Sequence, residues 1–244
     1  MRVVAASLSG QSDAEWARRA SEYVDRAILG GVALDEPSRE AARELVARGR
    51  EEFLPTDPLG FVNDQLAALS RDGIGTGFNV RSTSPGPVRA AAEICRNHDA
   101  IPEINAHCRQ AELCRVGCGE ALLRDTDRLS EQVRAAAETG ARVSVKVRAE
   151  VPGVDLVETA RAIEDAGAAI VHVDAMDSEP VIREVNEVSD LFVIANNEVR
   201  GRESAHEYFA LGADAVSVGR PSDDPRVLAR VREAVDAWDR EASA

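Results

Sequence analysis

The sequence predicts an α/β fold in which the whole chain, residues 1–244, forms a single (β/α)8 TIM barrel. Its 244 residues are close to the roughly 250 that eight strand–helix units require. Short apolar runs rich in β-branched residues alternate with longer stretches of helical period. Aromatic residues make up only 4% of the chain, while aliphatic residues and alanine dominate, which suits a parallel sheet covered by helices.

Eight apolar runs are expected to form strands, and amphipathic stretches between them are expected to form helices. The strands are predicted at residues 3–7, 28–34, 74–80, 101–106, 142–147, 170–173, 191–195 and 215–218. The helices are predicted at residues 13–23, 58–71, 87–96, 127–138, 156–166, 202–211 and 225–238. This alternation predicts parallel pairing with right-handed crossovers, and the count of eight predicts closure into a barrel.

One connection is longer than the others, and no segment marks a second domain. Residues 35–56 exceed what a single crossover needs and predict a helix followed by a proline-bounded loop. We find no linker or low-complexity stretch that would separate two folding units. The expectation is therefore one barrel.

The charge balance is strongly acidic and almost free of lysine. The formal net charge is -14, and of the 29 cationic Lys and Arg side chains only Lys146 is lysine. Such a carboxylate-rich surface is typical of halophilic proteins, in which acidic side chains keep the chain hydrated. It argues against nonspecific nucleic-acid binding, although molar salt screens long-range repulsion and a local arginine patch can still hold RNA.

The chain shows no membrane-spanning apolar stretch and no signal peptide, so we expect a cytoplasmic protein without a membrane partner. Its four cysteines are too few for a disulfide scaffold and are expected to be reduced thiols. The sequence leaves open whether the protein forms a homo-oligomer.

Polar residues follow several of the predicted strands at their carboxyl ends, where barrel enzymes assemble their sites. They are Ser7, Ser9, Asn79, Arg81, Asn105, His107, Cys108, Lys146, Arg148, His172, Asn196, Asn197, Gly219 and Arg220. Each has an ordinary structural alternative when taken alone. His172 suits a hydrogen-bonded core histidine, Asn196 and Asn197 suit a loop start, and Gly219-Arg220 suits either a tight turn or a phosphate site.

Lys146 is the most informative of these residues because it lies on an apolar strand. A lysine is a compact point donor with a movable pKa, whereas arginine is a planar and permanently charged fork. Lys146 therefore either serves a ligand at the barrel mouth or is paired with a neighbouring carboxylate.

The order of several motifs resembles that of a known superfamily. Residues 103–110 read Glu-Ile-Asn-Ala-His-Cys-Arg-Gln, and Gly-Cys-Gly-Glu-Ala-Leu-Leu follows at 117–123. The remaining motifs are Val-Lys-Val-Arg at 145–148, Val-His-Val at 171–173, Ile-Ala-Asn-Asn-Glu at 194–198 and the run 211–220. Together they cover about residues 74–222 and resemble the tRNA-dihydrouridine synthases and their dihydroorotate dehydrogenase relatives, nearest to an archaeal branch.

This resemblance implies a flavoprotein that carries flavin mononucleotide (FMN) over the barrel mouth. It implies that Lys146 contacts the pyrimidine end of the flavin and stabilises negative charge there, and that His172 and Asn79 also contact the cofactor. It implies that the backbone at Asn196, Asn197, Gly219 and Arg220 holds the phosphate. Asn105 would orient a uracil-like substrate.

Cys108 would then act as the general acid. When a uracil ring is reduced, hydride passes from flavin N5 to one alkene carbon while an acid protonates the neighbouring carbon. A thiol with an ordinary pKa of about 8.5 is mostly protonated at neutral pH, as this role requires. The alternative is a small buried thiol that packs as a hydrophobic side chain.

The sequence also departs from the family pattern. Ala195-Asn196-Asn197 stands where the synthases have Gly-Asn-Gly, and Arg109-Gln110 replaces the usual proline after the cysteine. Side chains thus occupy positions where the backbone would approach the phosphate, which predicts weaker or shifted FMN binding. The synthases also carry a helical RNA-binding domain after the barrel, whereas the expectation here is a single TIM barrel without the C-terminal helical RNA-binding domain.

Several functions remain open from the sequence. The first is a dihydrouridine synthase-like oxidoreductase in tRNA processing, and its runner-up is a dihydroorotate dehydrogenase-like enzyme acting on a free small pyrimidine. A non-redox barrel that binds a phosphorylated ligand is another. The last is a metal-stabilised protein in which His107, Cys108, Cys114 and Cys118 serve as ligands, with Cys114 and Cys118 on one helix face, although no Cys-x-x-Cys pair is present.

Overall fold

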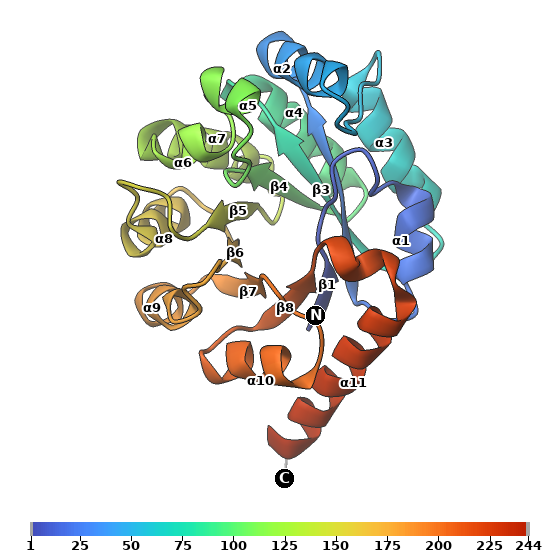
Figure 1. Cartoon of the computed structure of the whole chain (residues 1–244). Coiled ribbons are helices and arrows are strands. Elements are labelled where there is room, and N and C mark those ends of the chain that lie inside the picture. Colours follow the sequence, from blue (N-terminus) through green and yellow to red (C-terminus); the bar gives the residue numbers. More distant parts are fainter. Residues whose placement is uncertain (1, 243–244) are drawn as a thin grey trace.

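The computed structural model describes residues 2–242, in which eight parallel strands close into a barrel in chain order (Figure 1). The strands are β1 (Val3–Ala5), β2 (Arg26–Ala33), β3 (Gly75–Arg81), β4 (Ile101–Asn105), β5 (Ser144–Arg148), β6 (Ile170–Asp174), β7 (Phe192–Asn196) and β8 (Ala215–Val218). Each predicted strand coincides with one of them to within a few residues. The predicted (β/α)8 barrel is confirmed.

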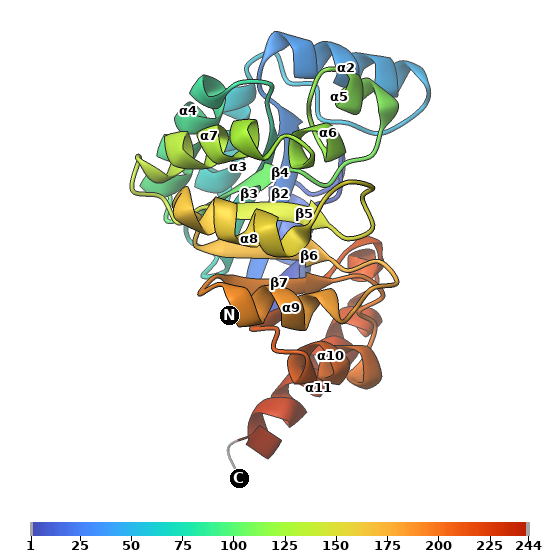
Figure 2. The ribbon, with the colours of Figure 1, turned by 90° about the vertical axis from the view of Figure 1, so that its left-hand side faces the viewer.

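Helices surround the strands on all sides (Figures 1 and 2). They are α1 (Ala14–Ala20), α2 (Glu36–Ala47), α3 (Pro58–Leu69), α4 (Pro85–Asn97), α5 (Ala111–Arg115), α6 (Glu120–Leu123), α7 (Thr126–Ala137), α8 (Leu156–Asp165), α9 (Val181–Val188), α10 (Arg202–Ala210) and α11 (Pro225–Ala242). A short 3₁₀ helix, η1 (Arg220–Asp223), follows β8. The expected helices are present, and the segment 35–56 forms α2 and a loop, whereas α5, α6 and α9 were not among the predictions.

Aspartate caps fix where five of the helices begin. The side chains of Asp13, Asp35, Asp57, Asp125 and Asp155 each accept a backbone N–H from the first turn of the helix that follows. Such a cap satisfies a donor that the helix itself leaves unpaired and contributes about 1 kcal/mol. These caps set where each of these helices begins after the strand or loop before it.

The barrel interior is built in layers because alternate residues of a strand point to the same side. An apolar layer contains Val4, Ile28, Ile101, Ile170, Ile194 and Ala215. The positions two residues further along three of these strands are Glu103, His172 and Ser217, all buried. The barrel therefore changes from an apolar base to a polar layer toward the carboxyl ends of its strands.

The last helix, α11, lies on the outside of the barrel. Helix α11 lies beside α10 in both views (Figures 1 and 2). The ring of Trp238 in α11 stacks on that of Phe209 in α10, with centroids 5.7 Å apart, and meets the ring of His206 edge-on at 5.1 Å. Among the described helices, none is both long and apolar enough to cross a membrane.

Candidate active site at the barrel mouth

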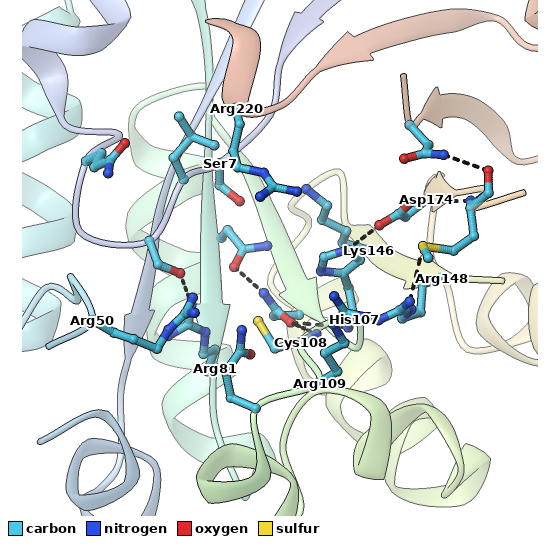
Figure 3. Close-up of a pocket in the computed structure, with 18 residues that line it drawn as sticks. Ser7, Arg50, Arg81, His107, Cys108, Arg109, Lys146, Arg148, Asp174 and Arg220 are labelled. Atoms are coloured by element: carbon cyan, nitrogen blue, oxygen red, sulfur yellow. Dashed lines mark hydrogen bonds and ion pairs between the residues drawn. The ribbon is translucent and has the colours of Figure 1, made fainter. Parts of the chain in front are cut away.

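Two adjoining cavities open at the carboxyl ends of the strands, where barrel enzymes place their sites. Their volumes are about 460 and 410 Å³, within the range typical of small-molecule and cofactor sites. Residues from both sides of the barrel line both cavities: Ser7, Leu8, His107, Lys146, Asp174, Asn197 and Arg220. The two volumes thus form one continuous mouth, the larger part of which is shown in Figure 3.

Most of the predicted site residues meet at this mouth. Asn79, Asn105, Cys108, Lys146, Asn197 and Arg220 line the first cavity, and Asn196 and Gly219 join some of them in the second. His172 lines neither cavity and is fully buried below them. Its predicted contact with a flavin stays a prediction, and what the structure shows instead is a structural role.

Lys146 is a buried cation that faces both cavities. It is 5% exposed, and its ammonium makes no hydrogen bond or ion pair with any residue between 2 and 242. Buried charges are nearly always paired, because removing an ammonium from water without a partner is costly. Lys146 acts on the carboxylates of Glu103 and Asp174 through its charge, without a direct ion pair to either, so its ammonium is available to a ligand.

A network of polar side chains fills the layer beneath Lys146. Glu103 is fully buried and accepts hydrogen bonds from Asn79 Nδ2 at 2.7 Å and from His172 Nδ1 at 2.8 Å. The other ring nitrogen of His172 lies 2.7 Å from Ser217 Oγ, which also accepts from Asn196 Nδ2 at 2.6 Å. These hydrogen bonds tie together five strands, β3, β4, β6, β7 and β8.

Burial decides the protonation of this network. Burial lowers the pKa of His172, and the Lys146 cation lowers it further against the opposing pull of Glu103. Burial would raise the pKa of Glu103, but the interactions with His172, Lys146 and Asn79 outweigh it and hold that pKa at about 2. The layer therefore contains a neutral imidazole that donates to a carboxylate.

Asn105 shapes the turn that carries Cys108. Its Oδ1 accepts from the backbone N–H of His107 at 3.2 Å and of Cys108 at 3.0 Å, and its Nδ2 donates to Asn79 Oδ1 at 2.8 Å. The spacing of Asn and Cys three residues apart thus has a local cause, because one amide oxygen closes the turn between them. The observed role is to position Cys108, and a direct contact of Asn105 with substrate stays a prediction.

Cys108 lies in the wall of the first cavity between two cationic groups, Arg81 and His107 (Figure 3). It is 8% exposed, and burial by itself would raise its pKa. The Arg81 guanidinium and a hydrogen bond with His107 outweigh burial and lower the pKa of the Cys108 thiol to about 7. The thiol is therefore more acidic than the ordinary cysteine that the sequence alone led us to expect.

Each of the two cationic groups beside Cys108 is held by a carboxylate. Arg81 Nη1 donates to Glu52 Oε2 at 2.6 Å, and both side chains are almost fully buried. His107 Nε2 lies 2.6 Å from Asp174 Oδ2 at the end of β6, with 26% and 15% of these side chains exposed. Sequence reasoning missed Glu52 and Asp174, although Asp174 lies two positions after His172 and so shares its inward face.

The second cavity is lined by the segments that follow β7 and β8. Asn197 has a φ of 113° and Glu198 a φ of 48°, so this segment adopts a backbone that favours glycine although the chain has none there. The side chain of Asn197 donates to Met176 O at 2.6 Å. The hydroxyl of Ser222, in the turn after Gly219, is buried and has no hydrogen-bond partner among the described residues.

The mouth is basic although the protein is acidic. The first cavity is lined by Lys146 and by Arg50, Arg81, Arg109, Arg148 and Arg220, whereas Asp174 is its one acidic residue. Arg50, Arg109 and Arg220 are exposed, and their side chains make no ion pair within residues 2–242. This local excess of positive charge favours an anionic ligand.

The cysteines do not form a metal site within the part of the chain that is described. In that part, no group of three or more His, Cys, Asp or Glu side chains is arranged to hold a metal ion. The expectation that Cys114 and Cys118 lie on one helix face is wrong, because α5 ends at Arg115 and Gly117 turns the chain with a φ of 86°. All four cysteines are free thiols.

Similarity to known proteins agrees with this architecture. A protein of Methanocaldococcus jannaschii that is named only as uncharacterised is 26% identical over 231 residues, covering 90% of this chain and 88% of its own. Two crystal structures share the fold at low identity. A proposed lyase/mutase of Burkholderia cenocepacia is 18% identical with a TM-score of 0.61, covering 99% of this chain and 82% of that one. A tryptophan synthase structure of Pyrococcus furiosus is 14% identical with a TM-score of 0.57, covering 98% and 95%.

A family model described as dihydrouridine synthase matches residues 78–243, from within β3 to beyond α11. The match includes Asn79, Asn105, Cys108 and Lys146, which meet at the first cavity. Since it spans more than half of the 244 residues, this protein belongs to the dihydrouridine synthase family.

Proposed function

We propose that this protein is an FMN-dependent oxidoreductase that acts on the uracil ring of uridine in RNA. The observation that carries the proposal is the placement of Lys146 and Cys108 in one cavity. The first is a buried cation that makes no direct hydrogen bond or ion pair among residues 2–242, and the second is an acidic thiol. Membership of the dihydrouridine synthase family supports the reaction class.

The residues at the mouth suit FMN. Lys146 offers a positive charge to the pyrimidine end of the flavin, where charge accumulates on reduction. Asn196, Asn197, Gly219 and Arg220 line the second cavity, and the unpaired hydroxyl of Ser222 follows in the same turn. The positive φ of Asn197 keeps a glycine-like backbone at the position where the family has glycine, so a phosphate can still be approached by the main chain.

The protein's own groups would divide the work as follows. A reduced flavin held at the mouth would supply the hydride for one carbon of the uracil double bond. Cys108 donates its proton to the neighbouring carbon, and Asn105 holds the turn that presents the thiol. The exposed Arg50, Arg109 and Arg220 bind phosphate groups of the substrate, which an acidic protein would otherwise repel.

Flavin binding is the first test. FMN is titrated into the purified protein in molar salt, and the dissociation constant is measured from the change in flavin absorbance and fluorescence. Lys146→Met should weaken binding by about 10-fold or more, because a hydrogen bond to a charged group contributes roughly 1.5–3 kcal/mol. Arg161→Gln, an exposed cation on α8, is the matched control and should leave the affinity unchanged. A wild-type protein that does not bind FMN would favour the non-redox phosphate-binding barrel.

Substrate class is tested next with the reduced holoprotein under anaerobic conditions. Re-oxidation of the flavin by a uridine-containing tRNA transcript, with dihydrouridine in the digested RNA, supports the proposal. Re-oxidation by free orotate but not by RNA would identify the small-pyrimidine alternative instead. Cys108→Ala should slow the step by about 10²-fold or more, as the loss of a general acid does.

A further inference from the structure

His107 and Asp174 have no role in the proposed reaction so far, yet both line the two cavities. His107 follows β4 directly before Cys108, and Asp174 ends β6 on the far side of β5. Their side chains meet at 2.6 Å between Nε2 and Oδ2, over 67 residues of sequence. The ends of β4 and β6 therefore place a carboxylate–imidazole pair in the cavity wall that contains the Cys108 thiol.

The geometry leaves one nitrogen of the imidazole for Cys108. Because Asp174 occupies Nε2, Nδ1 is the ring nitrogen left for the Cys108 thiol, which lies beside His107 in the wall of the same cavity (Figure 3). Burial would lower the pKa of His107, but the hydrogen bonds with Asp174 and Cys108 outweigh it and raise that pKa. The raised pKa favours the imidazolium, which donates from both nitrogens at once.

We propose that His107, held by Asp174, acts through Cys108 by stabilising the thiolate that remains when Cys108 gives its proton to the substrate. This inference rests on the proposed function and names the residues that set the acid strength of its general acid. The S–H bond of Cys108 breaks and a C–H bond forms on the ring carbon beside the one that receives hydride. The sulfur is left as a thiolate paired with the imidazolium, and a proton from water at the mouth restores the thiol.

Arg81 alone would not provide the same control. Its guanidinium also stabilises the thiolate, but it is fixed in the buried pair with Glu52 and cannot change its charge. Several other groups face the thiol and the imidazole: Lys146 from β5, Cys114 from α5, and Cys118 from the segment after α5. Of the charged groups around Cys108, His107 is the one that is partly exposed and able to exchange a proton with water at neutral pH.

The first test measures the thiol and needs no flavin. Alkylation of Cys108 by iodoacetamide is followed from pH 5 to 10 by peptide-resolved mass spectrometry, which separates it from the other three cysteines. His107→Gln should move the midpoint upward by about 1 pH unit or more, because a neighbouring opposite charge shifts a pKa by about 1–3 units. Asp174→Asn should move it in the same direction by less. His98→Gln, a histidine bonded to Asn63 at the end of α4, is the matched control and should not move it.

The second test measures the reaction in single turnover of the reduced holoprotein with tRNA. In His107→Gln the proton-transfer rate near pH 7 should fall about tenfold, because a weaker acid transfers its proton more slowly. The alkaline fall of the rate should at the same time move to higher pH, since the thiol stays protonated longer. If His107 had only a structural role, the substitution would lower the rate without changing the pH at which the rate falls on the alkaline side.

The outcomes separate the two proposals. If His107→Gln leaves both the alkylation midpoint and the pH–rate profile unchanged, the role of His107 is overturned while the proposed function stands. If the wild-type protein neither binds FMN nor reduces uridine, the proposed function is overturned, and with it the use of this pair in catalysis. Circular dichroism of each variant excludes unfolding as the cause of a change.

Discussion

Two histidine–carboxylate pairs lie in this barrel within one layer of each other, and they behave in opposite ways. His172 and Glu103 are 2.8 Å apart and fully buried, whereas His107 and Asp174 are 2.6 Å apart and partly exposed at the mouth. Burial lowers the pKa of His172, while the hydrogen bonds with Asp174 and Cys108 overcome burial and raise the pKa of His107. Nearly identical distances therefore give one neutral and one proton-binding imidazole.

The difference shows that depth and partners, more than contact distance, set the chemistry of such a pair. Both nitrogens of His172 face groups of the buried network, so its environment is complete without a ligand. His107 faces a thiol and two cavities. The lower pair stabilises the barrel, and the upper one is available for chemistry.

The largest effect is expected from breaking the lower pair. Glu103→Ala leaves His172 and Asn79 without their buried acceptor and should lower the free energy of unfolding by about 3–5 kcal/mol. Denaturant titration in high salt measures this loss. Glu131→Ala, an exposed carboxylate on α7, serves as the control and should change stability by less than about 0.5 kcal/mol. A loss below about 1 kcal/mol for Glu103→Ala would show that the network contributes little.

The two pairs should also respond to pH in opposite windows. The pKa of Glu103 is depressed from 4.5 to about 2, so its contribution is complete above about pH 4.5 and is lost as the pH falls toward 2. The pKa of His107 is raised above 6.5, so its contribution is present below pH 6.5 and is lost as the pH rises through the raised value.

Unfolding free energies of the wild type, Glu103→Gln and His107→Gln, measured from pH 3 to 9, test these windows. The difference in unfolding free energy between wild type and Glu103→Gln should become smaller as the pH falls. The difference between wild type and His107→Gln should become smaller as the pH rises. If both differences became smaller toward the same end of the pH range, the two pairs would not have the opposite pH dependence expected here.

The smallest effect is expected from the upper pair. Asp174→Asn should lower the free energy of unfolding by less than about 1 kcal/mol, because the pair is partly exposed and water replaces the lost interaction. Thermal unfolding of Asp174→Asn and of Glu103→Ala under the same conditions shows which variant loses more stability. A loss as large as that of Glu103→Ala would mean that the upper pair is also structural.

Much of the fold could be predicted because local sequence carries it. The eight apolar runs and the aspartates before five helices are signals that act within a few residues. Helix α9 was not predicted although Val181, Ile182 and Val185 have helical spacing, and it is only 8 residues long. Helices α5 and α6 span only one turn each, which periodicity does not detect.

The site was predictable in its position and less so in its pairings. Asn79, Asn105, Cys108 and Lys146 were expected at the mouth because they follow or end strands, and they line it. Sequence reasoning did not supply Glu52, which approaches Arg81 from a loop, or Asp174, which meets His107 across 67 residues. No local pattern encodes such partners.

The sequence by itself determined the barrel and which polar side chains point inward, because strand periodicity places alternate residues on one face. Only the tertiary structure decided that His172 is enclosed with Glu103 while His107 reaches the mouth beside Cys108. The reason is that solvation and charge depend on depth in the closed barrel and on neighbours from distant strands. The closure of the barrel and the register of its strands determine the depth of each residue and its neighbours.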